Sequence, residues 1–132
     1  MRTIGLLCVP TNSAGTISGV ARAPTTLREV GLVDALLHHT NVHDYGDVVL
    51  PDPSPERDPV THLIDHHGLI ALVTRVRDAV ASILDNGHFP LVIGGDCPLL
   101  VFHQAQQLTP RKPVKQHWPV PALLSTIVLS TT

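Results

Sequence analysis

The sequence is poor in cysteine, with only Cys8 and Cys97 among 132 residues. Two cysteines so far apart form no disulfide framework, which favours a reducing, cytoplasmic setting. Basic residues are also few: nine lysines and arginines against eleven acids give a formal net charge of −2 at pH 7. Because the chain has no basic block, binding of nucleic acid through phosphate neutralisation is not expected.

Long apolar runs are absent as well. No run approaches the roughly 20 residues of a membrane-spanning helix, so no membrane partner is expected. The apolar stretch near Met1 is too short for a signal peptide and predicts a first strand instead. A chain of 132 residues has room for one domain with its own core.

Acidic residues are missing from the last part of the chain. All eleven acids lie between Glu29 and Asp96, and with six arginines they give residues 1–96 a charge of −5, whereas residues 97–132 carry +3. Four of the twelve prolines fall within residues 110–121. We therefore separate residues 1–101 from an atypical, Pro-rich, acid-free tail at residues 102–132. The tail is either a surface extension or a segment foreign to the fold before it.

Two short apolar runs predict strands at residues 3–9 and 89–93, and a mixed segment predicts a strand at residues 42–49. Apolar rather than alternating patterns are typical of strands buried on both faces of a parallel sheet. A further apolar run at residues 122–129 is either a fourth strand or an exposed β-prone segment.

Helical periodicity predicts one helix near residues 26–38, with a break at Gly31, and a second at residues 69–86 with a clear apolar stripe. The resulting strand–helix–strand–helix–strand order predicts an α/β fold around a parallel sheet.

Local signals suggest where these helices begin. Thr26 and Glu29 have the spacing of a capping box. Asp58 and Pro59 have the order of an N-cap and a first-turn proline for the second helix. Gly68 is expected to interrupt that helix near its start.

In parallel sheets ligands bind at the carboxyl ends of the strands. Four polar residues fall near such predicted ends: Asp44 and Asp47 in the second strand, and Asp96 and Cys97 after the third. His62 and His66 have the i, i+4 spacing that lets two imidazoles share a metal ion on a helix. A solvated helix start is the favoured interpretation of this pair, because no carboxylate or cysteine motif completes the site.

Three segments together resemble the arginase/agmatinase (ureohydrolase) family. Residues 19–32 are similar to its Gly…Pro-x-x-Leu-Arg-x-x-Gly-Leu signature, and residues 42–47 to its Asp-x-Gly-Asp strand end. Residues 89–97 resemble the strand that ends in Gly-Gly-Asp-His, the family's first metal motif. The order and spacing of the segments also match, over residues 1 to about 101.

The resemblance implies a partial three-layer αβα arginase-like fold with a parallel sheet, and homo-oligomers are common in the family. It also implies Mn²⁺ as the cofactor: two ions activate a bridging hydroxide, which attacks the guanidinium carbon of a small guanidino substrate.

This chain departs from the family pattern at its first metal motif. Cys97 stands where the family has a metal-binding histidine, and a thiolate would shift the preference from Mn²⁺ toward Zn²⁺ or Fe²⁺. Asp96, Gly94 and Gly95 would then orient the ligand without binding the metal themselves. Cys97 has two other interpretations, an inert buried thiol, which is favoured, and a nucleophile.

The family's later metal motifs are absent, because the chain has no Asp-x-His-x-Asp and no acid after Asp96. We therefore expect a member or fragment of a family that hydrolyses guanidino or amidino C–N bonds, inactive by itself, with no catalytic residue assigned. The alternatives are a non-catalytic α/β binding module and a frameshifted or truncated gene product.

Overall fold

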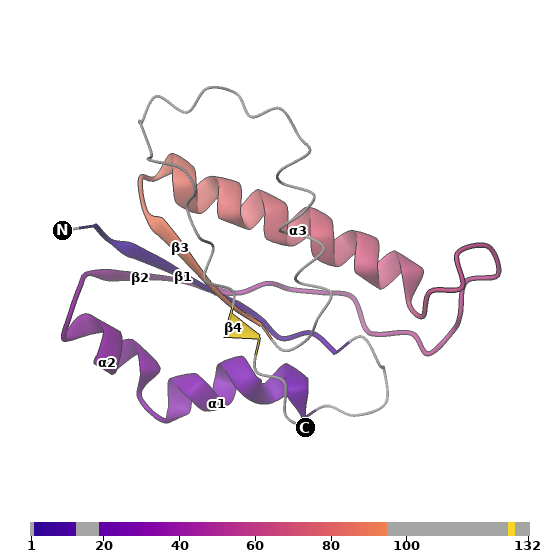
Figure 1. Cartoon of the computed structure of the whole chain (residues 1–132), viewed down its shortest axis with the longest axis horizontal. Coiled ribbons are helices and arrows are strands. Elements are labelled where there is room, and N and C mark those ends of the chain that lie inside the picture. The colour runs from indigo at the N-terminus through magenta and orange to yellow at the C-terminus, as the bar shows by residue number, and fades with distance from the viewer. Residues whose placement is uncertain (1, 13–18, 95–126, 129–132) are drawn as a thin grey trace.

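The computed structural model of the protein describes residues 2–12, 19–94 and 127–128. In chain order its elements are β1 (Ile4–Val9), a 3-10 turn (Val20–Arg22), α1 (Ala23–Glu29), α2 (Leu32–Leu37), β2 (Val42–Asp47), α3 (His66–Asp85), β3 (Phe89–Gly94) and β4 (Ile127–Val128). Figure 1 shows α3 on one side of the strands and α1 with α2 on the other. No helix of the described ranges is long and apolar enough to cross a membrane.

The four strands form one parallel sheet in the order β2-β1-β3-β4. β1 and β3 pair over their whole length, from Ile4 with Phe89 to Val9 with Gly94. The prediction of three neighbouring parallel strands is confirmed. The expectation of burial on both faces is wrong for β2, which ends at Asp47 and has no buried residue because it lies at the edge of the sheet.

The buried residues of β1 explain its central position. Leu7 and Val9 belong to the core beneath α3, whereas Leu6 and Cys8 pack with Ile93 on the opposite face. All four are at most 2% exposed, as a strand covered on both faces requires.

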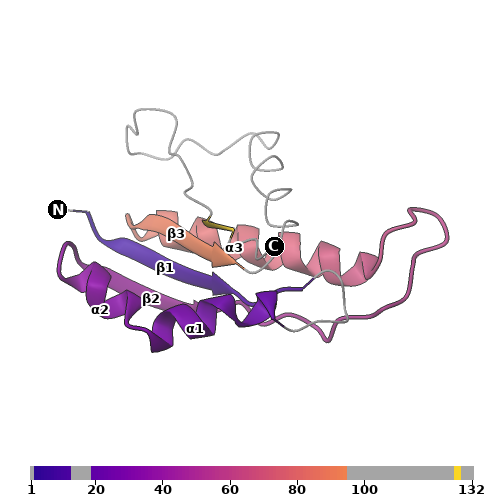
Figure 2. The same cartoon turned by 60° about the horizontal axis from the view of Figure 1, so that its bottom comes forward.

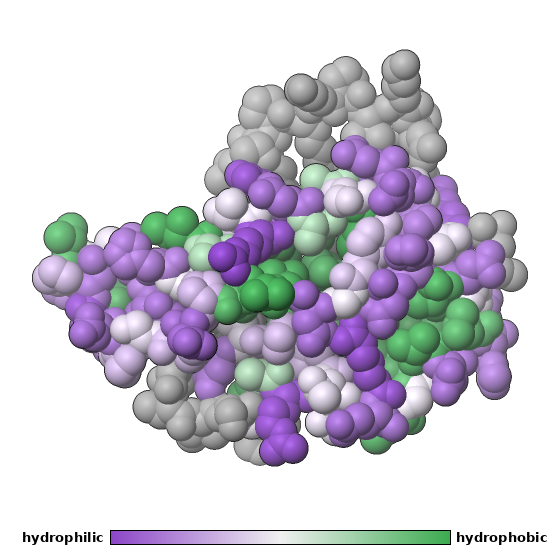
Figure 3. All heavy atoms as spheres, turned by 180° about the vertical axis from the view of Figure 1, so that it is seen from behind, coloured by the Kyte–Doolittle hydropathy of each residue, from purple (hydrophilic) through white to green (hydrophobic). Residues whose placement is uncertain are grey.

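The helices complete three layers, which confirms the αβα fold class (Figure 2). The buried stripe of α3 recurs every three or four residues, at Leu72, Val76, Val80 and Ile83. On the other face, α1 and α2 contribute half-buried apolar residues, Leu27, Leu32 and Val33. From behind, the surface is largely hydrophilic with separate apolar patches (Figure 3).

The predicted break at Gly31 is confirmed. Gly31 has a φ of +93° and precedes α2, so the segment at residues 26–38 forms two short helices rather than one. A residue with a Cβ would be strained in this conformation.

The predicted start of the first helix is wrong. α1 begins at Ala23, so Thr26 and Glu29 lie inside it, and its N-cap Arg22 makes no capping bond through its side chain. The helix continues directly from the 3-10 turn, and Pro24 in its first turn has the fixed φ that favours helix initiation.

The predicted start of the second helix is also wrong. Asp58 accepts the backbone N–H groups of Val60 and Thr61 at 3.0 and 2.6 Å and closes a separate turn. The N-cap of α3 is Asp65, whose Oδ1 accepts the N–H of Gly68 at 3.2 Å. Gly68 therefore stabilises the first turn of α3 instead of interrupting it.

The chain after β3 is described only at β4. Within the apolar run 122–129, Ile127 and Val128 form a strand, as one of the two interpretations predicted. The division between residues 1–101 and 102–132 stays a prediction, because it falls outside the described residues.

Candidate functional site

The carboxyl ends of the parallel strands lie at one edge of the sheet. β3 ends there at Gly94, a buried residue that pairs with Val9. Gly95, Asp96 and Cys97 follow it in the sequence but lie outside the described residues. The roles predicted for these three residues therefore stay predictions.

The two acids predicted near the end of the second strand, Asp44 and Asp47, both contact Arg28 of α1. Asp47 ends β2 as predicted, whereas Asp44 lies within the strand, opposite Leu6 of β1. Nη2 of Arg28 donates to Oδ1 of Asp44 at 2.7 Å, and Nη1 donates to Oδ1 of Asp47. Asp44 also accepts the backbone N–H of Gly46 at 2.8 Å. Both carboxylates are thus bound to one guanidinium, which fastens α1 to the edge strand β2.

Arg28 keeps its charge in this position. Burial alone would lower its pKa, but the hydrogen bonds to Asp47 and Asp44 and the nearby charges together raise it above the ordinary value. Its Nε atom is buried and has no hydrogen-bond partner among the described residues. Arg28 therefore neutralises the two acids and is not a proton donor at physiological pH.

Cys8 lies in β1 close to this cluster. Burial raises the pKa of its thiol from 9.0 to about 11, and the charge of Arg28 lowers it only in part. The side chain is fully buried. Because the thiolate is the reactive form, Cys8 is an inert core residue.

A second polar cluster lies over Gly5, and no sequence motif predicted it. The hydroxyl of Tyr45 is 2.9 Å from Nδ1 of His88 and accepts a hydrogen bond from the side-chain amide of Asn86 at 3.0 Å. The ring of His43 lies 4.7 Å from that of Tyr45, centroid to centroid. This cluster joins β2 to the turn that precedes β3.

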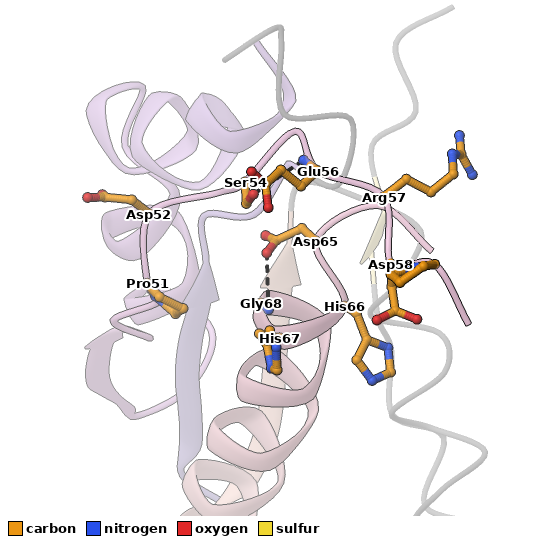
Figure 4. A pocket seen from close by; sticks show the side chains of 11 residues that line it. Pro51, Asp52, Ser54, Glu56, Arg57, Asp58, Asp65, His66, His67 and Gly68 are labelled. Carbon is orange, nitrogen blue, oxygen red and sulfur yellow. Dashed lines mark hydrogen bonds between the residues drawn. The ribbon is translucent and has the colours of Figure 1, made fainter. Parts of the chain in front are cut away.

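A cavity of about 330 Å³ lies beside the start of α3, lined by the loop from Pro51 to Pro59 and by residues 65–68 (Figure 4). His66 and His67 face it from the first turn, but His62 precedes the helix and has a φ of +60°. His62 and His66 therefore do not share one helical face, and the two-histidine metal interpretation is wrong.

The described residues do not fit a manganese centre. Within residues 2–12, 19–94 and 127–128, no three His, Cys, Asp or Glu side chains are placed to hold one metal ion. The two acids of β2, Asp44 and Asp47, are bound to Arg28.

Comparison with known proteins identifies the fold. A family model described as the arginase family matches residues 2–101. The chain belongs to the arginase family. This arginase-family chain is 32% identical to human Arginase-1 over 101 residues and 27% identical to an arginase of Staphylococcus aureus over 103 residues.

Solved structures agree. An arginase from Bacillus caldovelox superposes with a TM-score of 0.66 at 26% identity, covering 73% of this chain and 33% of that one. An Entamoeba histolytica arginase in complex with L-ornithine superposes with a TM-score of 0.68 at 22% identity, which shows the shared fold.

The match covers only part of each relative. It includes 76% of this chain but 31% of human Arginase-1. The chain therefore represents an N-terminal portion of the family's fold, as the three sequence segments predicted.

Proposed function

We propose that this chain forms the N-terminal part of an arginase-family hydrolase and does not by itself hydrolyse a guanidino or amidino C–N bond. The observation that supports this most directly is that the sequence has no Asp-x-His-x-Asp motif and no acid after Asp96. Those later motifs would supply most of the carboxylates that hold a pair of metal ions, and within the described residues Asp44 and Asp47 are bound to Arg28 instead.

The proposal extends to the metal. Manganese would supply an activated hydroxide in an intact family member, but the described residues offer no site for it. Cys97 replaces the family's histidine, and a thiolate binds zinc in preference to manganese. We therefore propose weak Mn²⁺ binding by this chain.

A small guanidino compound is the substrate class that the family relationship supports. Binding of such a substrate would require the part of the family's fold that lies beyond the matched residues 2–101. A cytoplasmic compartment remains part of the proposal, on the ground that the two cysteines form no disulfide framework.

Urea and ammonia release tests the proposal directly. The full chain is assayed on arginine, agmatine and other guanidino substrates, with and without Mn²⁺, beside an intact arginase as the positive control. We expect no release from this chain. The variant Cys97→His should also be inactive, because one restored imidazole does not assemble two metal ions. Turnover that disappears in Cys97→Ala would refute the proposal.

Metal content provides a second test. After dialysis against Mn²⁺ or Zn²⁺, elemental analysis should find little manganese and, if Cys97 is a ligand, zinc that is lost in Cys97→Ser. Cys8→Ser is the matched control, because Cys8 is buried and its thiol is held in the protonated form. Manganese retained at one or two ions per chain would contradict the proposed weak binding.

A further inference from the structure

The two edges of the sheet differ in how they avoid pairing with a strand of another chain. At one side β2 carries Asp44 and Asp47, and its register with β1 shifts between Leu6 and Cys8. Charged residues and bulges are the usual devices that keep an edge strand from pairing with another chain. These features should keep β2 from pairing with a strand of another chain.

β3 has a single protecting device, Pro90, which lacks a backbone N–H near the start of the strand. Its sequence, Phe-Pro-Leu-Val-Ile-Gly, has no charged residue, and four of its six residues are buried. A long, regular, apolar strand edge is a template for pairing with another strand. If the edge of β3 that faces away from β1 were left open, its carboxyl-terminal half could therefore pair with a strand of another chain.

The backbone of β3 shows which main-chain groups lie on the edge that faces away from β1. The N–H of Phe89 donates to the carbonyl of Thr3 at 2.9 Å, so Phe89 faces the β1 side. Because main-chain groups alternate along a strand, Leu91 and Ile93 face β1 as well, and Pro90, Val92 and Gly94 face away. Proline has no N–H, so the outer edge presents the donors of Val92 and Gly94 only.

β4 lies against this outer edge, at its carboxyl end. Ile93 pairs with Ile127 and Gly94 with Val128, in parallel. Figures 1 and 2 both place β4 beside β3. The strand comes from the tail, outside residues 2–101 that match the arginase family.

Charge favours this contact within one chain. Residues 1–96 carry −5 and residues 97–132 carry +3, so the tail is attracted to the body of the protein. The apolar run 122–129 that includes β4 suits pairing with an apolar strand.

We infer that Ile127–Val128 is a covering strand: it occupies the outer edge of β3 and prevents a second copy of this chain from pairing there. The ladder is only two residues long, so it opens more readily than the pairing of β1 with β3. Loss of the covering strand exposes the donor of Gly94 and the carbonyls beside it to another chain.

The test uses the full chain carrying Ile127→Pro, with Thr131→Pro as the matched control outside β4. Proline at Ile127 removes a backbone donor from a two-residue strand. Amide hydrogen exchange measured by NMR should become at least about tenfold faster at Gly94, and unchanged at Leu91 and Ile93, which face β1. Thr131→Pro should leave all three amides unchanged.

Sedimentation velocity tests the covering role. Ile127→Pro should form dimers or larger species at protein concentrations where the unaltered chain and Thr131→Pro do not. Unchanged exchange at Gly94 would overturn the inference. Faster exchange at Gly94 without association would also overturn it, and equal acceleration at Leu91 and Gly94 would show that β4 stabilises the whole sheet instead.

Discussion

β1 packs tightly against α3 at Gly5, the second residue of the strand, and this contact gives a sharp prediction for Gly5→Ala. A Cβ atom at Gly5 would lie 2.4 Å from Cγ2 of Ile83, 3.0 Å from Cε2 of Tyr45 and 3.4 Å from Cβ of His88. Ile83 is fully buried in α3, so it has no open space to move into. An added methyl group therefore forces β1 and α3 apart.

The cost follows from the size of this overlap. Overpacking a closed core by one methyl group costs about 1–3 kcal/mol. The 2.4 Å contact favours the upper half of that range, because an ordinary contact needs about 1 Å more between these atoms. A loss of about 2 kcal/mol lowers the Tm of a domain of this size by roughly 7 °C.

A double-mutant cycle isolates the contact. Urea unfolding followed by far-UV circular dichroism gives the free energy of unfolding for Gly5→Ala, for Ile83→Ala and for both together. Ile83→Ala alone should cost about 2–5 kcal/mol, because it leaves a cavity. In the double variant the new methyl group partly fills that cavity, so the combined loss should fall short of the sum by about 0.5–3 kcal/mol.

Val60→Ala is the control, because the side chain of Val60 is 83% exposed. Its effect should add to that of Gly5→Ala within about 0.5 kcal/mol. A Gly5→Ala variant as stable as the unaltered chain, or strict additivity with Ile83→Ala, would refute the packing of α3 on β1 at this point.

Three further predictions concern single residues. Arg28→Ala should lower the free energy of unfolding by about 1 kcal/mol, since its partly exposed ion pairs are screened by solvent, and Arg28→Lys should recover only part of this in urea unfolding. The pKa of the Cys8 thiol is about 11 when folded, above its ordinary 9.0, so the unfolded thiol loses its proton first and stability falls as pH rises from about 9 to 11. Unfolding at several pH values should show a decrease of about 2 kcal/mol that is absent in Cys8→Ala. Asp65→Ala should cost about 1 kcal/mol and lower the helical signal on heating, because it removes the N-cap of α3, whereas Asp65→Asn should cost less.

β1 and β3 could be predicted because a strand that is buried on both faces must consist of apolar residues. These two strands are covered on both faces of the sheet, so nearly every residue in them is apolar. The break between α1 and α2 could be predicted because glycine is the residue that most readily adopts a positive φ, as Gly31 does. The helix starts could not be predicted as well. Asp58 has the same local signal as the true cap Asp65, and only the intervening turn distinguishes them.

The polar clusters depend on the sheet order. Arg28 lies 16 residues before Asp44 and 19 before Asp47, and the three meet only because α1 covers the face next to β2. The sequence indicated a strand-end position for both acids but not their partner. Tyr45 and His88 are 43 residues apart and meet because β2 and β3 flank β1, so their contact leaves no local pattern.

The covering strand and the metal chemistry are separable in this chain. β4 meets β3 at Gly94, directly before Gly95, Asp96 and Cys97 in the sequence. Yet residues 97–132, which include β4, contain no acid, so they bring no carboxylate ligand to the edge where the family relationship implies a metal. Ile127→Pro should therefore change association without creating hydrolysis, and Cys97→His should change metal binding without changing association. If either variant changed both properties, the covering of β3 and the chemistry after Gly94 would be one coupled site.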